Sequence, residues 1–300
     1  MEGEHYDIAI IGGGIVGLAT ALAAAKRGKK VAVFEKNSKA QGASIRNFGM
    51  IWPIGQDTGQ NLETAILSRA IWMELAAKAK FWLRPNGSLH LAYHPLEKQV
   101  IDEFISQSDD ALYNIEWLSK DKTLETGNGI NPSNLLGALH SKTECLVNPR
   151  QAIQSVAAYL EEVYDVDFHY NTFINELDEG KLISEYDSWK ADHIFICSGA
   201  EFEYLYPSEY ADLPLKRCKL QMMKTAPQPA NWKLGPSLCG GLTLRHYNAF
   251  QNCSSLEALD KHFDSIDSRF KAYGIHVMVC QNNNGELIIG DSHEYGEDIH

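Results

Sequence analysis

Three glycines near the start of the chain have the spacing of a phosphate-binding loop. Gly12, Gly14 and Gly17 fit the pattern G-x-G-x-x-G. The apolar segment 6–11 before them is rich in β-branched residues and predicts a buried strand. The segment after them is rich in alanine and leucine and predicts a helix that ends near Gly28. A glycine turn at a helix N-terminus offers unpaired N–H groups to a pyrophosphate, so this stretch predicts dinucleotide binding.

An acidic residue stands where a second contact to such a dinucleotide is expected. Residues 30–35 predict another buried strand, which ends at Glu35. A carboxylate at this place accepts hydrogen bonds from a ribose diol and repels a 2′-phosphate, which disfavours NADP. The pattern leaves NAD and FAD open, and a glycine-rich turn without a ligand is the alternative.

A polar stretch follows the second predicted strand. Residues 41–56 are punctuated by glycine and show no clear helix or strand period. The stretch can lie along a second part of the cofactor, or it can be a surface loop. Its candidate contacts are the side chains of Ser44, Arg46 and Asn47 and the backbone of Gly49 and Met50.

Residues 241–247 supply candidates for substrate binding. We predict a strand here, in which Arg245 and Tyr247 share one face and His246 lies on the other. An arginine and a tyrosine on one face can bind an acidic group, since the guanidinium offers a planar fork and the phenol another donor. A solvated strand face with an ion pair is the alternative.

Three histidines lie in or beside the predicted strands of this region. His246, His276 and His293 can each pair with a carboxylate or a phosphonate, but a structural or surface histidine is the more common case for each. The cysteines and histidines do not have the spacing of a zinc site, so no metal is predicted.

Composition and charge exclude several classes of protein. The chain has 300 residues, 44% hydrophobic and 22% charged, which is typical of a folded globular protein and is long enough for two domains. The net charge is −12, so nucleic acid and anionic membranes are poor partners. The 6 cysteines include no CxxC pair and are interpreted as reduced thiols in a cytoplasmic protein. Glycines interrupt the uncharged run 8–25 and acidic residues precede it, so we predict neither a signal peptide nor a membrane span.

The order of predicted elements indicates an α/β protein with two interleaved domains. Residues 1–80 and 148–204 are expected to form a Rossmann-like domain on a parallel sheet. Residues 81–147 and 205–300 are expected to form an α+β substrate domain on a mixed or antiparallel sheet. Within that domain, residues 282–285 separate two apolar strands and predict a hairpin turn.

The chain resembles the FAD-dependent amine and amino-acid oxidoreductases, which include D-amino-acid oxidase, glycine oxidase and sarcosine oxidase. The glycine loop, Glu35 and the segments 42–50, 193–200 and 285–291 carry the resemblance, which spreads over nearly the whole chain. The chain resembles most closely a subgroup that is associated with phosphonate breakdown. The segments that suggest this subgroup are 46–49, 241–247 and 290–296.

The resemblance implies a site for FAD. The glycine loop would hold the pyrophosphate, Glu35 the adenosine ribose, and residues 44–50 the flavin side. No histidine stands in the loop where some relatives of sarcosine oxidase attach FAD, so non-covalent FAD is expected. Such enzymes usually continue into a glycine-rich segment that returns to the flavin ring, and we expect this sequence to stop short of it. The expected cofactor contacts are Gly12, Gly13, Gly14, Ile15, Gly17, Glu35, Lys36, Ser44, Arg46, Asn47, Gly49, Met50, Ser198 and Gly199.

The resemblance also implies an activity. We expect oxidation of a C–N bond in a small amine, amino acid or aminophosphonate that docks near Arg245, Tyr247, His246 and His276. A hydride passes to flavin N5, water hydrolyses the resulting imine, and oxygen or another acceptor takes up the electrons. One alternative is a flavin-dependent dehydrogenase of 2-hydroxy acids or alcohols, in which a histidine serves as base. The other is a non-catalytic FAD-binding subunit.

Overall fold

The computed structural model describes residues 4–108 and 110–296, which form two compact units. The described residues of the first unit are 4–49, 74–82 and 148–216, and those of the second are 50–73, 83–147 and 217–296. Both units are discontinuous in sequence. Three segments differ from the expected domain limits, since 50–73 lie in the second unit and 81–82 and 205–216 in the first. The strand at Met50 and Ile51 pairs with residues 145–147, which holds it in the second unit.

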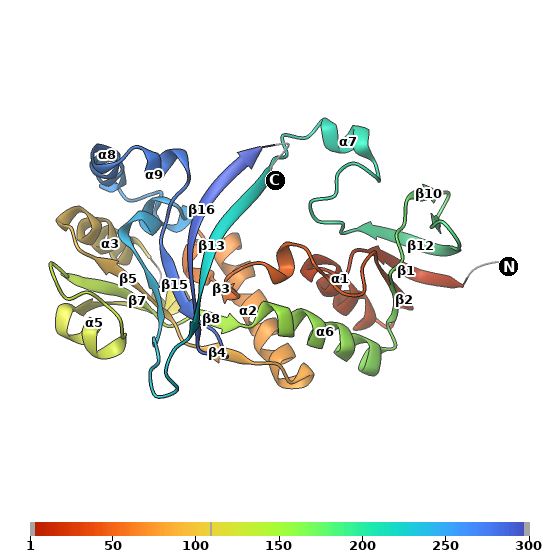
Figure 1. Cartoon of the computed structure of the whole chain (residues 1–300), viewed down its shortest axis with the longest axis horizontal. Helices are drawn as coiled ribbons and strands as arrows, with labels where there is room; N and C mark the ends of the chain where they lie inside the picture. The colour runs from red at the N-terminus through yellow and green to blue at the C-terminus, as the bar shows by residue number, and fades with distance from the viewer. Residues whose placement is uncertain (1–3, 109, 297–300) are drawn as a thin grey trace. The chain divides into compact units, whose positions relative to one another are not determined.

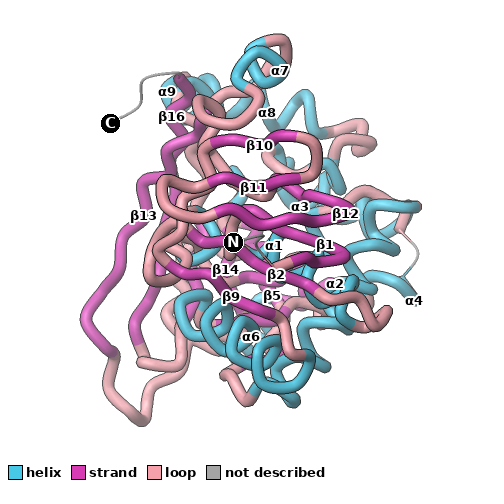
Figure 2. Tube along the Cα trace, turned by 90° about the vertical axis from the view of Figure 1, so that its right-hand side faces the viewer, coloured by secondary structure: helices cyan, strands magenta, loops and turns pink. Residues whose placement is uncertain are grey.

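The first unit is built on a six-stranded sheet in the order β10-β11-β12-β1-β2-β9, which can be followed in Figure 2. Strands β12, β1, β2 and β9 are parallel, and β10 and β11 form an antiparallel hairpin beside β12. The strands are β1 (His5–Ile11), β2 (Val31–Glu35), β9 (Asp167–Tyr170), β10 (Glu176–Asp178), β11 (Lys181–Ile183) and β12 (Ser188–Ile196). The helices are α1 (Ile15–Ala25), the 3₁₀ turn η1 (Ala43–Ile45), α6 (Pro149–Tyr164) and α7 (Pro207–Ala211).

The central strands of this sheet are apolar on both faces, as a parallel sheet between helices requires. All five residues of β2 are buried, and Ala9 and Ile10 of β1 are fully buried. Helix α6 begins at a polar cap, because the Asn148 side chain accepts a hydrogen bond from the Arg150 N–H at 3.2 Å. The packed sheet fixes the carboxyl ends of β1 and β2, and the glycine loop and Glu35 lie at these ends.

The second unit contains a seven-stranded mixed sheet in the order β13-β16-β15-β14-β5-β7-β6 and a small sheet in the order β3-β8-β4. Strands β14 and β5 are parallel, and the other pairs are antiparallel. Figure 1 shows β13 and β16 as long neighbouring strands. The strands are β3 (Met50–Ile51), β4 (Leu83–Pro85), β5 (Ser88–Ala92), β6 (Ile115–Ser119), β7 (Gly137–Ser141), β8 (Cys145–Val147), β13 (Arg217–Pro227), β14 (Ser237–Cys239), β15 (Met278–Gln281) and β16 (Glu286–Gly296).

The helices of the second unit lie along its core of apolar side chains, which includes Val100, Phe104, Phe250 and Leu259. The helices are α3 (Pro95–Gln107), α4 (Asp110–Tyr113), α5 (Lys120–Thr126), α8 (Leu256–Ile266) and α9 (Arg269–Ala272). The 3₁₀ turns are η2 (Pro53–Gly55), η3 (Gly241–Arg245) and η4 (Asn248–Phe250). The residues of α2 (Gln60–Ala79) divide between the two units after Met73.

Residues 241–247 do not form a strand, so the predicted strand faces are wrong. Strand β14 ends at Cys239, and the chain turns into η3, where the Thr243 N–H bonds to the Gly240 carbonyl at 2.9 Å. A Cβ on Gly241 would overlap the carboxylate of Glu97, so the backbone approaches α3 too closely for a side chain there. Arg245 and Tyr247 therefore do not share a strand face.

The hairpin predicted at 282–285 is confirmed. It joins β15 to β16, and the Gly285 N–H donates to the Asn282 carbonyl at 3.1 Å. Among the described residues, no helix combines the length and the apolar character that a membrane crossing requires.

Candidate functional site

The glycine loop between β1 and α1 is packed so tightly that side chains cannot be added at two of its positions. Gly12 has a φ of +112°, and a Cβ there would overlap the carbonyl oxygen of Cys197. A Cβ on Gly17 would overlap the carbonyl oxygen of Gly12. The first glycine therefore permits the turn, and the third permits the helix to lie against it.

The N-terminus of α1 is free of acidic side chains. Gly14 is the N-cap residue and has no side chain to satisfy the first N–H groups, and the first turn contains neither aspartate nor glutamate. The Ile15 N–H donates to the Ser44 hydroxyl at 2.9 Å. Because the first turn itself carries no acidic side chain, the positive end of the helix dipole remains available to the pyrophosphate of a dinucleotide, with Glu35 beside it at Gly13.

Glu35 at the end of β2 is buried and braces the loop. Its Oε2 accepts a hydrogen bond from the Gly13 N–H at 3.0 Å, and its Oε1 accepts from the Asn37 N–H at 2.9 Å and the Asn37 amide at 3.0 Å. A carboxylate offers about four acceptor positions, so one remains for a ribose hydroxyl. Glu35 can therefore hold the loop and bind the sugar at the same time.

The polar stretch after β2 closes on itself. The Asn47 amide donates to the Ala43 and Ser44 carbonyls at 2.9 and 3.2 Å, and the Gly49 N–H donates to Asn47 Oδ1 at 2.8 Å. Arg46 is exposed. These contacts fix the loop in which Ser44 reaches the start of α1.

The other expected cofactor residues have different surroundings. Lys36 forms an exposed ion pair with Glu201 at 2.8 Å. The backbone nitrogen of Ser198 lies 3.4 Å from the position that a Cβ on Gly12 would occupy, so residues 197–199 lie beside the first glycine turn. Met50 belongs to the second unit, where it pairs with Leu146 in the β3–β8 sheet.

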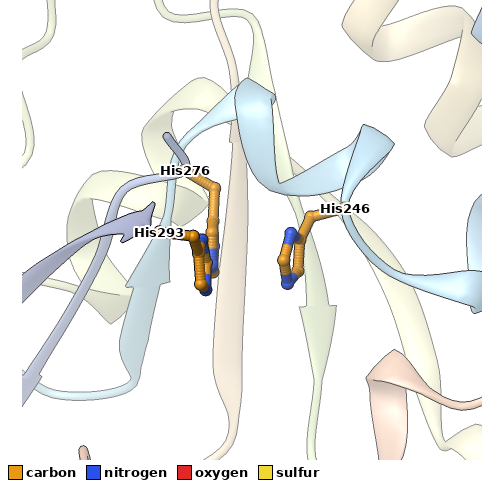
Figure 3. Close-up of side chains that lie close together, drawn as sticks. All are labelled: His246, His276 and His293. Carbon is orange, nitrogen blue, oxygen red and sulfur yellow. The ribbon is translucent and has the colours of Figure 1, made fainter. Parts of the chain in front are cut away.

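The second unit brings together three histidines from separate segments. His246 follows η3, His276 precedes β15, and His293 lies in β16. Figure 3 shows the three rings side by side, and one ring nitrogen of each lies within 4.8 Å of the others. The His246 and His276 rings are stacked with centroids 3.9 Å apart. Although part of the His246 side chain is exposed, desolvation of its ring among its neighbours and the nearby His276 and His293 lower its pKa to about 4.

A buried carboxylate lies beside these rings. Asp291 Oδ1 is 2.9 Å from His276 Nε2, and Asp291 Oδ2 is 3.7 Å from His293 Nε2. The backbones of His276 and Asp291 exchange hydrogen bonds of 3.3 and 2.8 Å, which hold the two side chains together. We call His246, His276, His293 and Asp291 the histidine cluster.

The arginine and the tyrosine predicted to bind substrate have separate partners. The Arg245 Nη1 atom lies 3.0 Å from Asp260 and 3.3 Å from Asp264, so two carboxylates balance its charge. Its ion pairs match the alternative that the sequence left open. The Tyr247 hydroxyl lies 3.5 Å from the Met278 sulfur, and burial raises the pKa of this phenol. Its ring contacts His246 and His276, with centroids 5.0 and 6.0 Å away.

Sequence reasoning missed the convergence of His293 and Asp291 on His276. One signal was available, because residues two apart in a strand share a face, and Asp291 and His293 both lie in β16. It also missed Asn37, whose donors hold Glu35 in place.

Comparison with known proteins identifies similar sequences over most of the chain. The family model described as FAD dependent oxidoreductase (DAO) matches residues 7–299. A glycine oxidase of Geobacillus kaustophilus is 30% identical over 151 residues, which are 46% of this chain and 38% of that protein. A D-amino acid dehydrogenase of Helicobacter pylori is 26% identical over 65% of this chain and 60% of its own length. A glycerol 3-phosphate dehydrogenase of Caloramator mitchellensis is 24% identical over 96% of this chain and 56% of its own length. The chain therefore spans between 38% and 60% of these relatives.

Solved structures show the same fold. An L-proline dehydrogenase from P. horikoshii matches with a TM-score of 0.77 and 18% identity, over 99% of this chain and 72% of that one. An L-α-glycerophosphate oxidase from Mycoplasma pneumoniae with FAD bound matches with a TM-score of 0.73 and 20% identity, over 98% of this chain and 73% of that one. The predicted α/β fold class is confirmed by these matches.

Proposed function

Because the chain belongs to the FAD dependent oxidoreductase (DAO) family, and FAD is the cofactor of that family, we propose that it oxidises a C–N bond in a small amine or amino acid. The observation that carries the proposal is the glycine loop of the first unit, which fits a pyrophosphate and has an acidic partner for a ribose. Relatives named for glycine and for D-amino acids support amino-acid substrates. The family match does not extend to the phosphonate subgroup, so aminophosphonates remain proposed substrates.

The chain's own residues bind and orient in this proposal. When bound, FAD would supply the acceptor for the two electrons of the C–H bond next to the nitrogen. The N–H groups at the start of α1 bind the pyrophosphate, and Glu35 binds the adenosine ribose while holding Gly13. No protein base is required to break the C–H bond next to a neutral amine.

The second unit supplies the substrate side of the proposal. We assign the acidic group of the substrate to the neighbourhood of His246, His276 and Tyr247, whose rings contact one another. Arg245 is retained as a weaker candidate, because Asp260 and Asp264 already balance its guanidinium. One of its terminal nitrogens, Nη2, is buried without a hydrogen-bond partner among the described residues.

Flavin reduction without oxygen tests the activity. The chain is reconstituted with FAD and mixed anaerobically with glycine, D- and L-amino acids, N-methylated amines and aminophosphonates. Loss of the flavin absorbance with an amine supports the proposal, and the panel identifies the substrate class. If every amine leaves the absorbance unchanged while a hydroxy compound bleaches it, amine oxidation is wrong.

Oxidation of an alcohol is the second candidate. A relative named glycerol 3-phosphate dehydrogenase aligns with 96% of the chain, the widest coverage among the three relatives compared above. Alcohol oxidation needs a base for the hydroxyl proton. His276 can serve as this base, because the neighbouring Asp291 carboxylate would orient its ring. Bleaching by glycerol 3-phosphate or a 2-hydroxy acid, and its loss in His276→Asn, would favour this candidate.

A further inference from the structure

The histidine cluster has the composition of a metal site, although the sequence shows no metal-binding spacing. Its three imidazoles come from residues 246, 276 and 293, and one ring nitrogen of each lies within 4.8 Å of the others. His276 and His293 are buried, whereas His246 is exposed, so an ion could enter from the His246 side. Figure 3 shows that the side chains extend in the same direction from three separate segments.

The partners of the buried rings determine which nitrogens are free to ligate. His293 Nδ1 lies 2.8 Å from the Gly274 carbonyl oxygen, which can only accept, so the proton is on Nδ1 and the lone pair is on Nε2. His276 Nε2 faces Asp291 at 2.9 Å, which leaves the lone pair on Nδ1. This Nδ1 is buried and has no hydrogen-bond partner among the described residues. Histidines that bind metals are commonly oriented in this way, with the second ring nitrogen donating to a carbonyl or a carboxylate.

The position of His293 depends on a glycine. Gly274 has a φ of +51°, and a Cβ there would lie 2.8 Å from His293 Nδ1 and 3.0 Å from its Cβ. A side chain at this position would push the imidazole out of the cluster. The close approach of the Gly274 backbone therefore keeps the ring within the cluster and sets its protonation.

The charge around the cluster favours a cation over an anion. Asp291 is a buried acidic group within 4 Å of two of the rings, and an anion placed among the rings would meet it. The neighbouring cation, Arg245, is paired with Asp260 and Asp264 and does not offset this charge. We propose that His246, His276 and His293 bind a divalent transition-metal ion such as Zn²⁺, with Asp291 orienting His276.

The proposed site requires the rings to turn, because their planes are now nearly parallel, with interplanar angles of 7–17°. Ligand nitrogens around a tetrahedral zinc ion, each about 2.1 Å from the metal, are separated by roughly 3.4 Å. Rotation of the stacked rings about their side-chain bonds can bring nitrogens that now lie within 4.8 Å to that separation. Three histidines leave a fourth position, which suits imidazole-binding metals such as zinc, nickel and copper with an exchangeable ligand.

The open position suggests a use for the ion, and this use rests on the proposed function. A bound ion supplies the positive charge that an acidic substrate group requires and that the paired Arg245 lacks. Metal binding itself does not depend on FAD, so the two proposals can fail separately.

Metal titration tests the site. The tag-free chain is freed of metal with a chelator and titrated with Zn²⁺ by calorimetry and with Co²⁺ by visible absorption. We expect one ion per chain, with the intense visible bands of Co²⁺ in a low-coordinate nitrogen site. His276→Ala and His293→Ala should each weaken Zn²⁺ binding by about 100-fold. His246→Asn, at an exposed position, should weaken it comparably without unfolding the core.

A matched control is present in the same unit. His262 stacks on His94 with centroids 3.9 Å apart, which is the ring separation of His246 and His276, but this pair lacks a third histidine. His262→Ala should leave Zn²⁺ affinity unchanged, and thermal unfolding of every variant separates ligand loss from loss of fold. No binding by the wild-type chain, or equal affinity in the His246 and His262 variants, would overturn the site. Binding of Zn²⁺ without flavin bleaching by any amine would instead leave the site standing and remove the proposed function.

Discussion

In the first unit the polar groups of the glycine loop and its neighbours form hydrogen bonds with one another. In the second unit, several buried side-chain atoms have no hydrogen-bond partner. Glu35, Gly13, Asn37, Ser44 and Ile15 are joined by hydrogen bonds of 2.9–3.0 Å. Among the described residues, the buried side-chain atoms without a partner all lie in the second unit. They include Trp52 Nε1, Asn86 Oδ1, both ring nitrogens of His90, Arg245 Nη2 and His276 Nδ1.

The contrast indicates two ways of making a binding site. The first unit offers backbone N–H groups from a rigid turn, so its side chains can be fully paired before a ligand arrives. The second unit offers side-chain atoms, and a buried polar atom without a partner costs free energy until water, an ion or a ligand supplies one. Unpaired buried atoms therefore mark where the second unit can accept ligands.

The largest effect is expected from a substitution in the glycine loop of the first unit. In Gly17→Val the new side chain overlaps the Gly12 carbonyl, so the turn must open and its N–H groups lose their alignment. We expect FAD affinity to fall at least about 1,000-fold, or roughly 4 kcal/mol, in a flavin fluorescence titration. Gly28→Asn is the control, since Gly28 has open space around it and a φ of +72° that asparagine tolerates. Retained FAD affinity in the Gly17 variant would show that the loop does not bind the cofactor.

The unpaired buried atoms of the second unit can be tested at His90, whose pKa is lowered to about 3 by burial. Below the unfolded-state pKa of about 6.5, His90 binds a proton in the unfolded chain but not in the folded chain. The free energy of unfolding therefore decreases as the pH is lowered from about 6.5 to 3. This group alone should cost about 3 kcal/mol by pH 4. His90→Phe should flatten the acid side of a denaturant-unfolding series, whereas a substitution of the exposed His193 should not. Parallel pH profiles for wild type and His90→Phe would mean that the buried ring is already satisfied.

Glu35→Gln tests whether the charge of Glu35 contributes to FAD binding. The amide keeps one acceptor for the Gly13 N–H but loses the charge and presents a donor to Asn37 or to the ribose. FAD affinity should fall about 10-fold, because one charge-assisted hydrogen bond is lost. Glu161→Gln, an exposed change in α6 of the same unit, should leave affinity unchanged. Equal affinities for the two variants would assign Glu35 to structure alone.

The smallest effect is expected at Ser44. Ser44→Ala removes the acceptor of the Ile15 N–H, while Ser44→Thr keeps a hydroxyl there. We expect a loss in FAD affinity of about 3-fold to 5-fold for alanine, with recovery for threonine, as for other hydroxyl groups at helix N-termini. A larger loss for threonine than for alanine would mean that bulk, and not the hydrogen bond, matters at this position.

The parts that could be predicted from sequence are those whose residues are neighbours along the chain. The strand, glycine turn and helix of residues 6–28 follow one another directly, and Glu35 ends the next strand, so local pattern alone places them together. The hairpin at 282–285 is local in the same sense. The interleaving of two domains stays a prediction from the alternation of parallel-sheet and antiparallel-sheet patterns along the chain.

The histidine cluster and the pairing of Arg245 could not be predicted, because their members come from distant segments. Residues 246, 276 and 293 meet only after η3 turns back and β16 pairs with β15. The strand predicted at 241–247 is wrong because an alternating pattern over so few residues does not distinguish a strand from a turn. Asp260 and Asp264 lie one helical turn apart on α8, but nothing local indicates that they face Arg245.

A Cβ added at Gly12 would overlap the Cys197 carbonyl, and one added at Gly17 would overlap the Gly12 carbonyl. These two clashes limit how the protein can be redesigned to accept another coenzyme. Both positions are closed to substitution, so redesign of nucleotide preference must begin at the end of β2, with Glu35 and Asn37, and leave the turn untouched. In a library that randomises residues 12–17, most variants would be unable to form the turn.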